Sequence, residues 1–144
     1  MRVEESELGV RVRVLLRRGD KEIITSALLN TGFESEELDL VLPSQLADEL
    51  GLRSELGEFV RLDTAGGPLE CAFVEQALEL KLLLEDREEP ELTCNAIVSP
   101  YEREVLLSDA VIEALGIQII SAKSGKWRLK DDPPGLERSS VSPA

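Results

Sequence analysis

The chain has 144 residues, of which 42% are hydrophobic and 31% charged, a composition that fits one domain with a substantial core. Its 29 acidic and 16 basic residues give a net charge of −13. Such a charge repels phosphate backbones, so we expect no nucleic-acid partner. No stretch approaches the roughly 20 apolar residues of a membrane-spanning helix and the first residues do not resemble a signal peptide, so we expect a cytoplasmic protein with no membrane partner.

Several residue types are rare or absent. The chain has no histidine, which excludes His-based catalytic triads and most zinc sites. We find no glycine-rich phosphate loop, no Cys/His cluster and no EF-hand spacing, so we expect no metal and no cofactor. Cys71 and Cys94 lie in apolar, strand-like runs and are expected to be buried thiols, although a disulfide is an alternative in a hyperthermophile. Abundant Arg and Glu with only two Asn favour a thermophilic source.

The chain begins with a predicted hairpin. Val10, Val12 and Val14 alternate with arginines, which indicates a half-buried strand, and Arg18-Gly19-Asp20 predicts the turn before a returning strand at 22–29. The long apolar run at 69–84 is expected to hold two strands or one bent strand. Further strands are expected at 38–42, 59–62, 92–98, 104–107, 117–120 and 127–129.

Two short helices are expected among these strands. The first follows Ser44, a candidate N-cap, and ends at Gly51; the second follows Ser108 or Asp109 and ends at Gly116. Many short strands, two short helices and several glycine-containing turns favour an all-β barrel or sandwich. From residue 131 the Pro, Gly and Ser content rises, so residues 131–144 are expected to form a disordered tail.

A polar turn follows the apolar strand that ends at Leu29. Two hydrophobic residues followed by Asn30-Thr31-Gly32 resemble the active-site loop of retropepsin-like aspartic proteases, whose pattern is two hydrophobic residues followed by Asp-Thr/Ser-Gly. The segments 41–52 and 105–117 are similar to the strand–helix pairs found later in that family. The resemblance implies a retropepsin-like acid-protease barrel over residues 1–130, with two short helices and a flap hairpin. The residues expected at the flap are Thr64, Ala65, Gly66 and Gly67.

The resemblance also implies a chemistry. The family forms one catalytic centre from two identical loops, and the two carboxyl groups share a proton so that one acts as base and the other as acid on water. A chain of this length holds one such loop, so the resemblance implies a homodimer. The flap would close over an extended peptide or protein substrate held by strand-like pairing, and no cofactor is needed.

Position 30, however, is Asn where the family has Asp. An amide does not ionise near neutral pH, so Asn30 is expected to abolish or strongly impair hydrolysis. Asn30 is then native in a retired, peptide-binding relative, or was introduced to silence a working protease, or another carboxylate acts instead. The candidates for that carboxylate are Asp63 and Glu34. Asp109 is expected to begin a helix, and Ser108 stands where the family usually has Gly.

A last alternative lies outside this family. The chain would then be a non-catalytic peptide-binding or regulatory β-barrel module, in which Asn30-Thr31-Gly32 is only a turn. A monomer without paired loops at Asn30 would favour that interpretation.

Overall fold

The computed structural model describes residues 9–52, 58–64 and 66–144. Strands make up 52% of it and helices 9%. The barrel strands and their extension are β1 (Arg11–Arg18), β2 (Lys21–Leu29), β3 (Asp39–Pro43), β4 (Glu58–Thr64), β5 (Gly67–Leu82), β6 (Glu91–Ser99) and β7 (Val105–Leu107). The remaining elements are α1 (Ser44–Glu49), α2 (Asp109–Ala114), β8 (Ile117–Ser121), β9 (Lys126–Leu129) and β10 (Arg138–Ser139).

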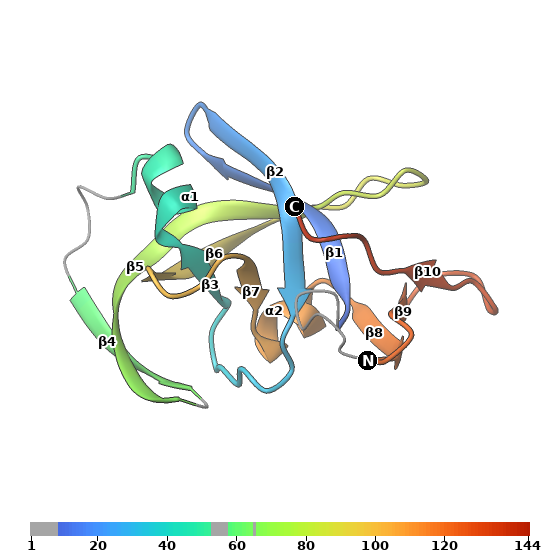
Figure 1. Ribbon diagram of the computed structural model, residues 1–144. Coiled ribbons are helices and arrows are strands. Elements are labelled where there is room, and N and C mark those ends of the chain that lie inside the picture. Colours follow the sequence, from blue (N-terminus) through green and yellow to red (C-terminus); the bar gives the residue numbers. More distant parts are fainter. Residues whose placement is uncertain (1–8, 53–57, 65) are drawn as a thin grey trace.

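Six strands close into a barrel in the order β1-β2-β7-β3-β6-β5, and β5 returns to pair with β1 (Figure 1). The pairs β2–β7 and β3–β6 are parallel, whereas the other barrel pairs are antiparallel. The expected all-β fold with two short helices is therefore confirmed. Neither described helix is long and apolar enough to cross a membrane.

The barrel core follows from the alternation of apolar residues along the strands. Val10, Val12, Val14 and Leu16 are buried, and they alternate with polar or less buried residues, as expected for a strand with one face toward the core. Cys71 and Cys94 are buried and both are free thiols, which confirms the expectation of buried cysteines.

The run at 69–84 forms one bent strand. The register between β5 and β6 shifts between Val74 and Leu78, and Gln76 in this bend has a φ of 47°, a conformation that is unfavourable for a residue with a side chain. The first half of β5 pairs with β4 and the second half with β1. The bend therefore carries the β4–β5 hairpin away from the closed part of the barrel, as Figure 1 shows.

The two helices differ at their first turn. The N-cap of α1 is Pro43 and no side chain caps it, so the expectation that Ser44 is the N-cap is wrong: Ser44 is already the first helical residue. Ser108 is the N-cap of α2, and its side chain accepts a hydrogen bond from the backbone N–H of Val111. Gly51 follows α1 in the left-handed conformation, with φ 75°, as expected for a glycine that ends a helix.

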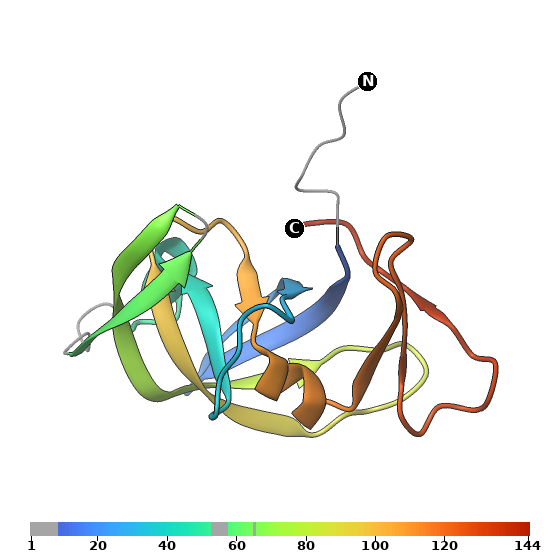
Figure 2. The same ribbon diagram turned by 90° about the horizontal axis from the view of Figure 1, so that it is seen from below.

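Residues 131–144 were expected to be a disordered tail, and the structure instead places them against the barrel (Figure 2). β10 pairs with β9 in a three-stranded sheet with β8. The N–H of Val141 donates to the carbonyl of Arg11, and the N–H of Ala144 donates to Ser26 Oγ. The composition of this segment is typical of a disordered tail, but its hydrogen-bond partners on β1 and β2 are distant in sequence.

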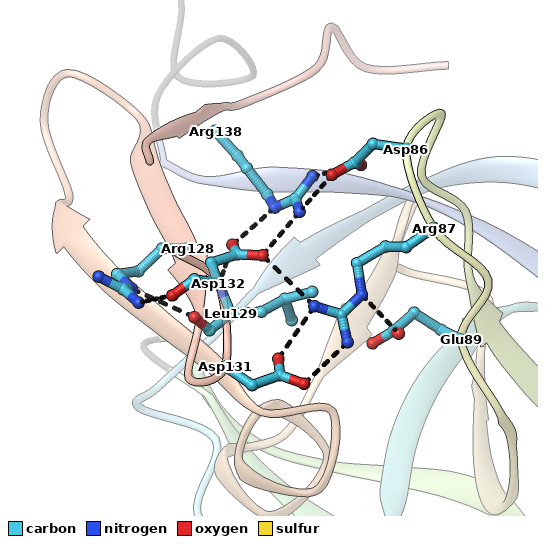
Figure 3. A network of polar contacts seen from close by, with 8 residues as sticks. All are labelled: Asp86, Arg87, Glu89, Arg128, Leu129, Asp131, Asp132 and Arg138. Atoms are coloured by element: carbon cyan, nitrogen blue, oxygen red, sulfur yellow. Dashed lines mark hydrogen bonds and ion pairs between the residues drawn. The ribbon is translucent and has the colours of Figure 1, made fainter. Parts of the chain in front are cut away.

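A charged network holds the start of this segment (Figure 3). The Asp132 carboxylate accepts hydrogen bonds from Arg138 at 2.8 and 2.9 Å, and Arg87 bridges Asp131 and Asp132 from the loop between β5 and β6. Arg138 also pairs with Asp86 at 2.8 Å. Ion pairs between loops that are far apart in sequence thus hold the start of residues 131–144 in place.

Candidate functional site

A cleft of about 740 Å³ lies between the loop after β2 and the β4–β5 hairpin. We call it the Asn30 cleft. Its lining residues are Asn30, Gly32, Phe33, Glu34, Ser35, Asp39, Val41, Val60, Arg61, Asp63, Phe73, Ile97, Glu102 and Leu106. Strands β3, β4, β5, β6 and β7 all contribute residues to it, so the cleft depends on how these five strands pair.

The Asn30 loop is a tight turn attached to the barrel. The N–H of Asn30 donates to the carbonyl of Leu107 on β7 at 3.0 Å, and the N–H of Phe33 donates to the carbonyl of Asn30 at 3.0 Å. Asn30 Oδ1 accepts the N–H of Gly32 at 3.2 Å. An aspartate at position 30 would keep this last hydrogen bond, because either carboxylate oxygen can accept it.

The loop exposes the residues that the resemblance singles out. Asn30 is half-buried, and Thr31 and Gly32 are exposed. A Cβ atom at position 32 would lie 3.4 Å from Asn30 Oδ1, in van der Waals contact with the amide. Thr31 does not line the cleft in the single chain, whereas Asn30 and Gly32 do.

The floor of the cleft is apolar. Val41, Cys71 and Ile97 form a small buried cluster separate from the barrel core. Val41 and Ile97 of this cluster line the cleft, whereas Cys71 does not. Partly buried hydrophobic side chains that pack against the cluster also line the cleft: Phe33, Val60, Phe73 and Leu106. None of these floor residues was identified as a site residue from the sequence, because their apolar pattern is that of ordinary strand residues.

Both alternative carboxylates named from the sequence lie at this cleft. Glu34 follows the Asn30 loop and Asp63 lies near the end of β4, and both are exposed lining residues. Asp39 and Glu102 also line the cleft and were missed. Burial, followed by the nearby Glu104, raises the pKa of Glu102 above its usual value.

A buried asparagine links the segment after the Asn30 loop to the bend of β5. Asn95 Nδ2 donates to Glu37 Oε1 at 3.1 Å and to Asp39 Oδ1 at 2.9 Å, on the side of the Asn30 loop. Asn95 Oδ1 accepts the N–H of Gln76 at 2.9 Å, in the bend of β5. Sequence reasoning missed this residue, although a single Asn within the apolar run at 92–98 was a signal for a buried polar contact.

The start of α2 also supports the loop. Asp109 is the first residue of this helix, as expected, and its Oδ1 accepts the N–H groups of Ser35 and Ala110 at 2.9 and 2.7 Å. The N–H of Asp109 donates to the carbonyl of Phe33. Ser108 is fully buried beneath the loop, and its hydroxyl serves as the helix cap, at the position where retropepsin-like proteases usually have Gly.

The hairpin expected to be a flap is present as β4 and β5. Thr64 pairs with Gly67 at its end, and Gly67 has a φ of 111°, which favours glycine. Gly66 is exposed, and Ala65 lies outside the described residues. The hairpin residues that line the cleft are Val60, Arg61, Asp63 and Phe73, nearer the barrel than the turn itself.

Within the described part of the chain, no group of three or more Cys, Asp or Glu residues is arranged to hold a metal ion. No family model matches the chain, and no curated protein has significant similarity to it.

Proposed function

We propose that this protein binds extended peptides in the Asn30 cleft without hydrolysing them, and that two copies share the cleft as a homodimer of retropepsin-like chains. The observation that carries the proposal is the cleft itself, with an apolar floor between the Asn30 loop and the β4–β5 hairpin. An apolar floor of this kind can bury the alternate side chains of an extended ligand.

The edge of β4 supports a strand-like mode of binding. β4 stands at the end of the sheet order, and β5 is its partner within the described residues. Its other edge can therefore donate and accept backbone hydrogen bonds with an added peptide strand. Peptide pairing there would bring ligand side chains to Val60, Arg61 and Asp63, which line the cleft.

The residue at position 30 argues for binding over hydrolysis. The Asn30 amide has no acidic proton to transfer, and it is too weak a base to take one from water near neutral pH. Its Oδ1 is already engaged with the N–H of Gly32. Loss of general acid–base catalysis typically lowers a rate by about 10²- to 10⁴-fold, and loss of both members of a coupled pair lowers it further.

The homodimer follows from the resemblance and from what the loop exposes. One chain supplies one Asn30 loop, so a symmetric cleft needs a second copy. Thr31 and Gly32 are exposed next to the cleft, where a two-fold partner would contact them. In the related proteases it is the threonine of this loop that joins the two copies.

The test combines binding, cleavage and mass measurements on the full chain. We expect sedimentation to give a dimer and a randomised peptide library to be retained by the protein. Mass spectrometry of the library from about pH 3 to 7 should detect no cleavage by the protein, and cleavage by Asn30→Asp that an aspartic-protease transition-state mimic stops. The pI near 4.4 requires a check for precipitation in that range.

Each alternative result would contradict one part of the proposed function. Mimic-sensitive cleavage by the unaltered protein would overturn the non-catalytic assignment and direct attention to Asp63 and Glu34. Retention of no peptide by either Asn30 or Asn30→Asp protein would overturn peptide binding. A monomer that still retains peptides would overturn the shared cleft and favour the β-barrel module in which Asn30-Thr31-Gly32 is only a turn.

A further inference from the structure

The Asn30 cleft has an uneven charge. Its lining includes the carboxylates of Glu34, Asp39, Asp63 and Glu102 and the guanidinium of Arg61. Asp39 is engaged by Asn95 and by the hydroxyl of Ser35. The structure gives the other three carboxylates no ion-pair partner among the residues it describes.

Several carboxylates elsewhere in the described part of the chain, by contrast, pair with arginines. Arg17 binds Glu91 at 2.8 Å, and Arg138 binds both Asp132 and Asp86 at 2.8 Å. Ion pairs thus neutralise some acidic groups elsewhere, whereas Glu34, Asp63 and Glu102 at the cleft have no such partner among the described residues and remain available to a ligand. A half-buried carboxylate such as Glu102 favours a cationic neighbour in particular, because burial and Glu104 disfavour its charge when it is alone.

The acidic groups surround an apolar floor. Floor residues such as Val41 and Ile97 are buried, whereas Glu34 and Asp63 are exposed at the rim. An extended peptide directs successive side chains to opposite sides. One set of alternate side chains would therefore contact the floor, while the other set would reach the rim.

We infer that the ligands of the Asn30 cleft are extended peptides in which apolar residues alternate with lysine or arginine. This inference rests on the proposed function and adds to it the chemical class of the ligand. The apolar residues supply the buried contact, and the basic residues pair with Glu34, Asp63 and Glu102. Peptides with acidic residues at the same positions are repelled by the rim and by the net charge of −13.

The test uses three labelled ten-residue peptides that share apolar residues at alternate positions and carry Lys, Gln or Glu at the others. Fluorescence anisotropy on the full chain gives their dissociation constants. One exposed ion pair changes affinity by roughly twofold or more, so three such pairs give about tenfold tighter binding of the Lys peptide than of the Gln peptide. The Glu peptide should bind weakest, and about 0.5 M salt should reduce the differences among the three dissociation constants.

Two matched variants test whether the preference for the Lys peptide depends on the cleft carboxylates. The triple variant Glu34→Gln, Asp63→Asn, Glu102→Gln should bind the Lys and Gln peptides within about twofold of each other. The control variant Glu22→Gln, Glu113→Gln, Glu137→Gln removes the same charge from exposed positions outside the cleft, and it should keep the full preference. Circular dichroism checks that both variants are folded.

The outcomes separate the two proposals. Binding of the three peptides with equal affinity, or an equal loss of preference in the control variant, would overturn the inference about basic ligands and leave peptide binding intact. Tight binding of the Glu peptide would do the same. Failure of all three peptides to bind while library peptides are still retained would overturn only the inference about basic ligands, and failure of the library as well would overturn both proposals.

Discussion

Substitution of Asp132 by Asn should destabilise the fold by removing the charge at the centre of the network in Figure 3. The Asp132 side chain is 1% exposed, and it accepts hydrogen bonds from Arg138 Nε and Nη2 at 2.9 and 2.8 Å and from the N–H of Leu129 at 2.8 Å. Asn keeps the shape and one acceptor oxygen. Its Nδ2 group, however, would face the donors of Arg138, so at least one hydrogen bond and the ion pair are lost.

The size of the effect follows from the carboxylate's pKa. The hydrogen bonds from Arg138, helped by the Leu129 N–H and opposed by burial, lower the pKa of Asp132 to about 2. Against an ordinary value of about 3.9, that difference corresponds to about 2–3 kcal/mol of stability at neutral pH. Arg138 also binds Asp86, whose side chain is 55% exposed, and solvent screening around that exposed group reduces the loss. We therefore expect Asp132→Asn to lower the free energy of unfolding by about 2 kcal/mol.

The sign of the pH dependence is fixed by the lowered pKa. The carboxylate's contribution is fully present above the unfolded-state pKa near 4, and it is lost as the pH falls through about 2. Urea unfolding followed by circular dichroism should give a constant difference between the two proteins from about pH 5 to 7 and a shrinking difference below about pH 4. The region around the pI of 4.4 is avoided because of precipitation.

A neighbouring residue provides the control. Asp131 binds Arg87 in the same network at 2.9 Å, but its side chain is 71% exposed. Asp131→Asn should therefore destabilise the protein less than Asp132→Asn does. Equal losses for the two variants, or a loss for Asp132→Asn that does not change with pH, would refute the assignment of the stability to the buried ionised carboxylate.

Three further predictions concern other buried groups. Asn95→Ala should lower the free energy of unfolding in urea by about 1–3 kcal/mol, because the N–H of Gln76 loses its acceptor. It should also weaken peptide binding, because the cleft residue Asp39 loses the hydrogen bond from Asn95 Nδ2, and unchanged binding would contradict this. Glu104→Gln should lower the free energy of unfolding by about 1–3 kcal/mol, because the Arg11 guanidinium, which is 2% exposed and held by two hydrogen bonds to Glu104, loses its counter-charge. A free energy of unfolding equal to that of the unaltered protein would contradict this expectation. Cys94, whose pKa burial raises to about 12, should resist a thiol reagent at about pH 8 until the chain unfolds, and fast labelling of the folded chain would contradict that expectation.

Much of the fold could be predicted from local pattern. The valine alternation at 10–14 and the glycine turn at Gly19 identified the first hairpin, and the caps at Ser108 and Gly116 identified α2. These signals depend on residues that are close in sequence. The misassigned cap at Ser44 shows the limit of that reasoning, because a preceding proline already has the extended conformation that an N-cap needs.

Contacts that are distant in sequence could not be predicted. Residues 131–144 have the composition of a tail, but Asp132 and Arg138 meet Arg87 and Asp86 only after the barrel has formed. The candidate site has the same limit. The motif at Asn30 and the hairpin near Asp63 were found by resemblance, whereas the floor and the bridging amide of Asn95 depend on how β3, β5 and β6 pair.

Under the proposed function the charges of this chain have two different roles, and that division can be measured. Arg11, Arg87 and Arg138 neutralise buried or partly buried carboxylates, so substitutions there change the free energy of unfolding. Exposed cleft carboxylates such as Glu34 and Asp63 have no such partners among the described residues, and their substitution should alter stability by no more than about 0.5 kcal/mol. If these carboxylates serve ligands, their substitution changes peptide preference at nearly constant stability, whereas substitutions in the arginine network change stability at nearly constant preference. A variant of either set that changed both quantities together would mean that the cleft and the network are one cooperative unit.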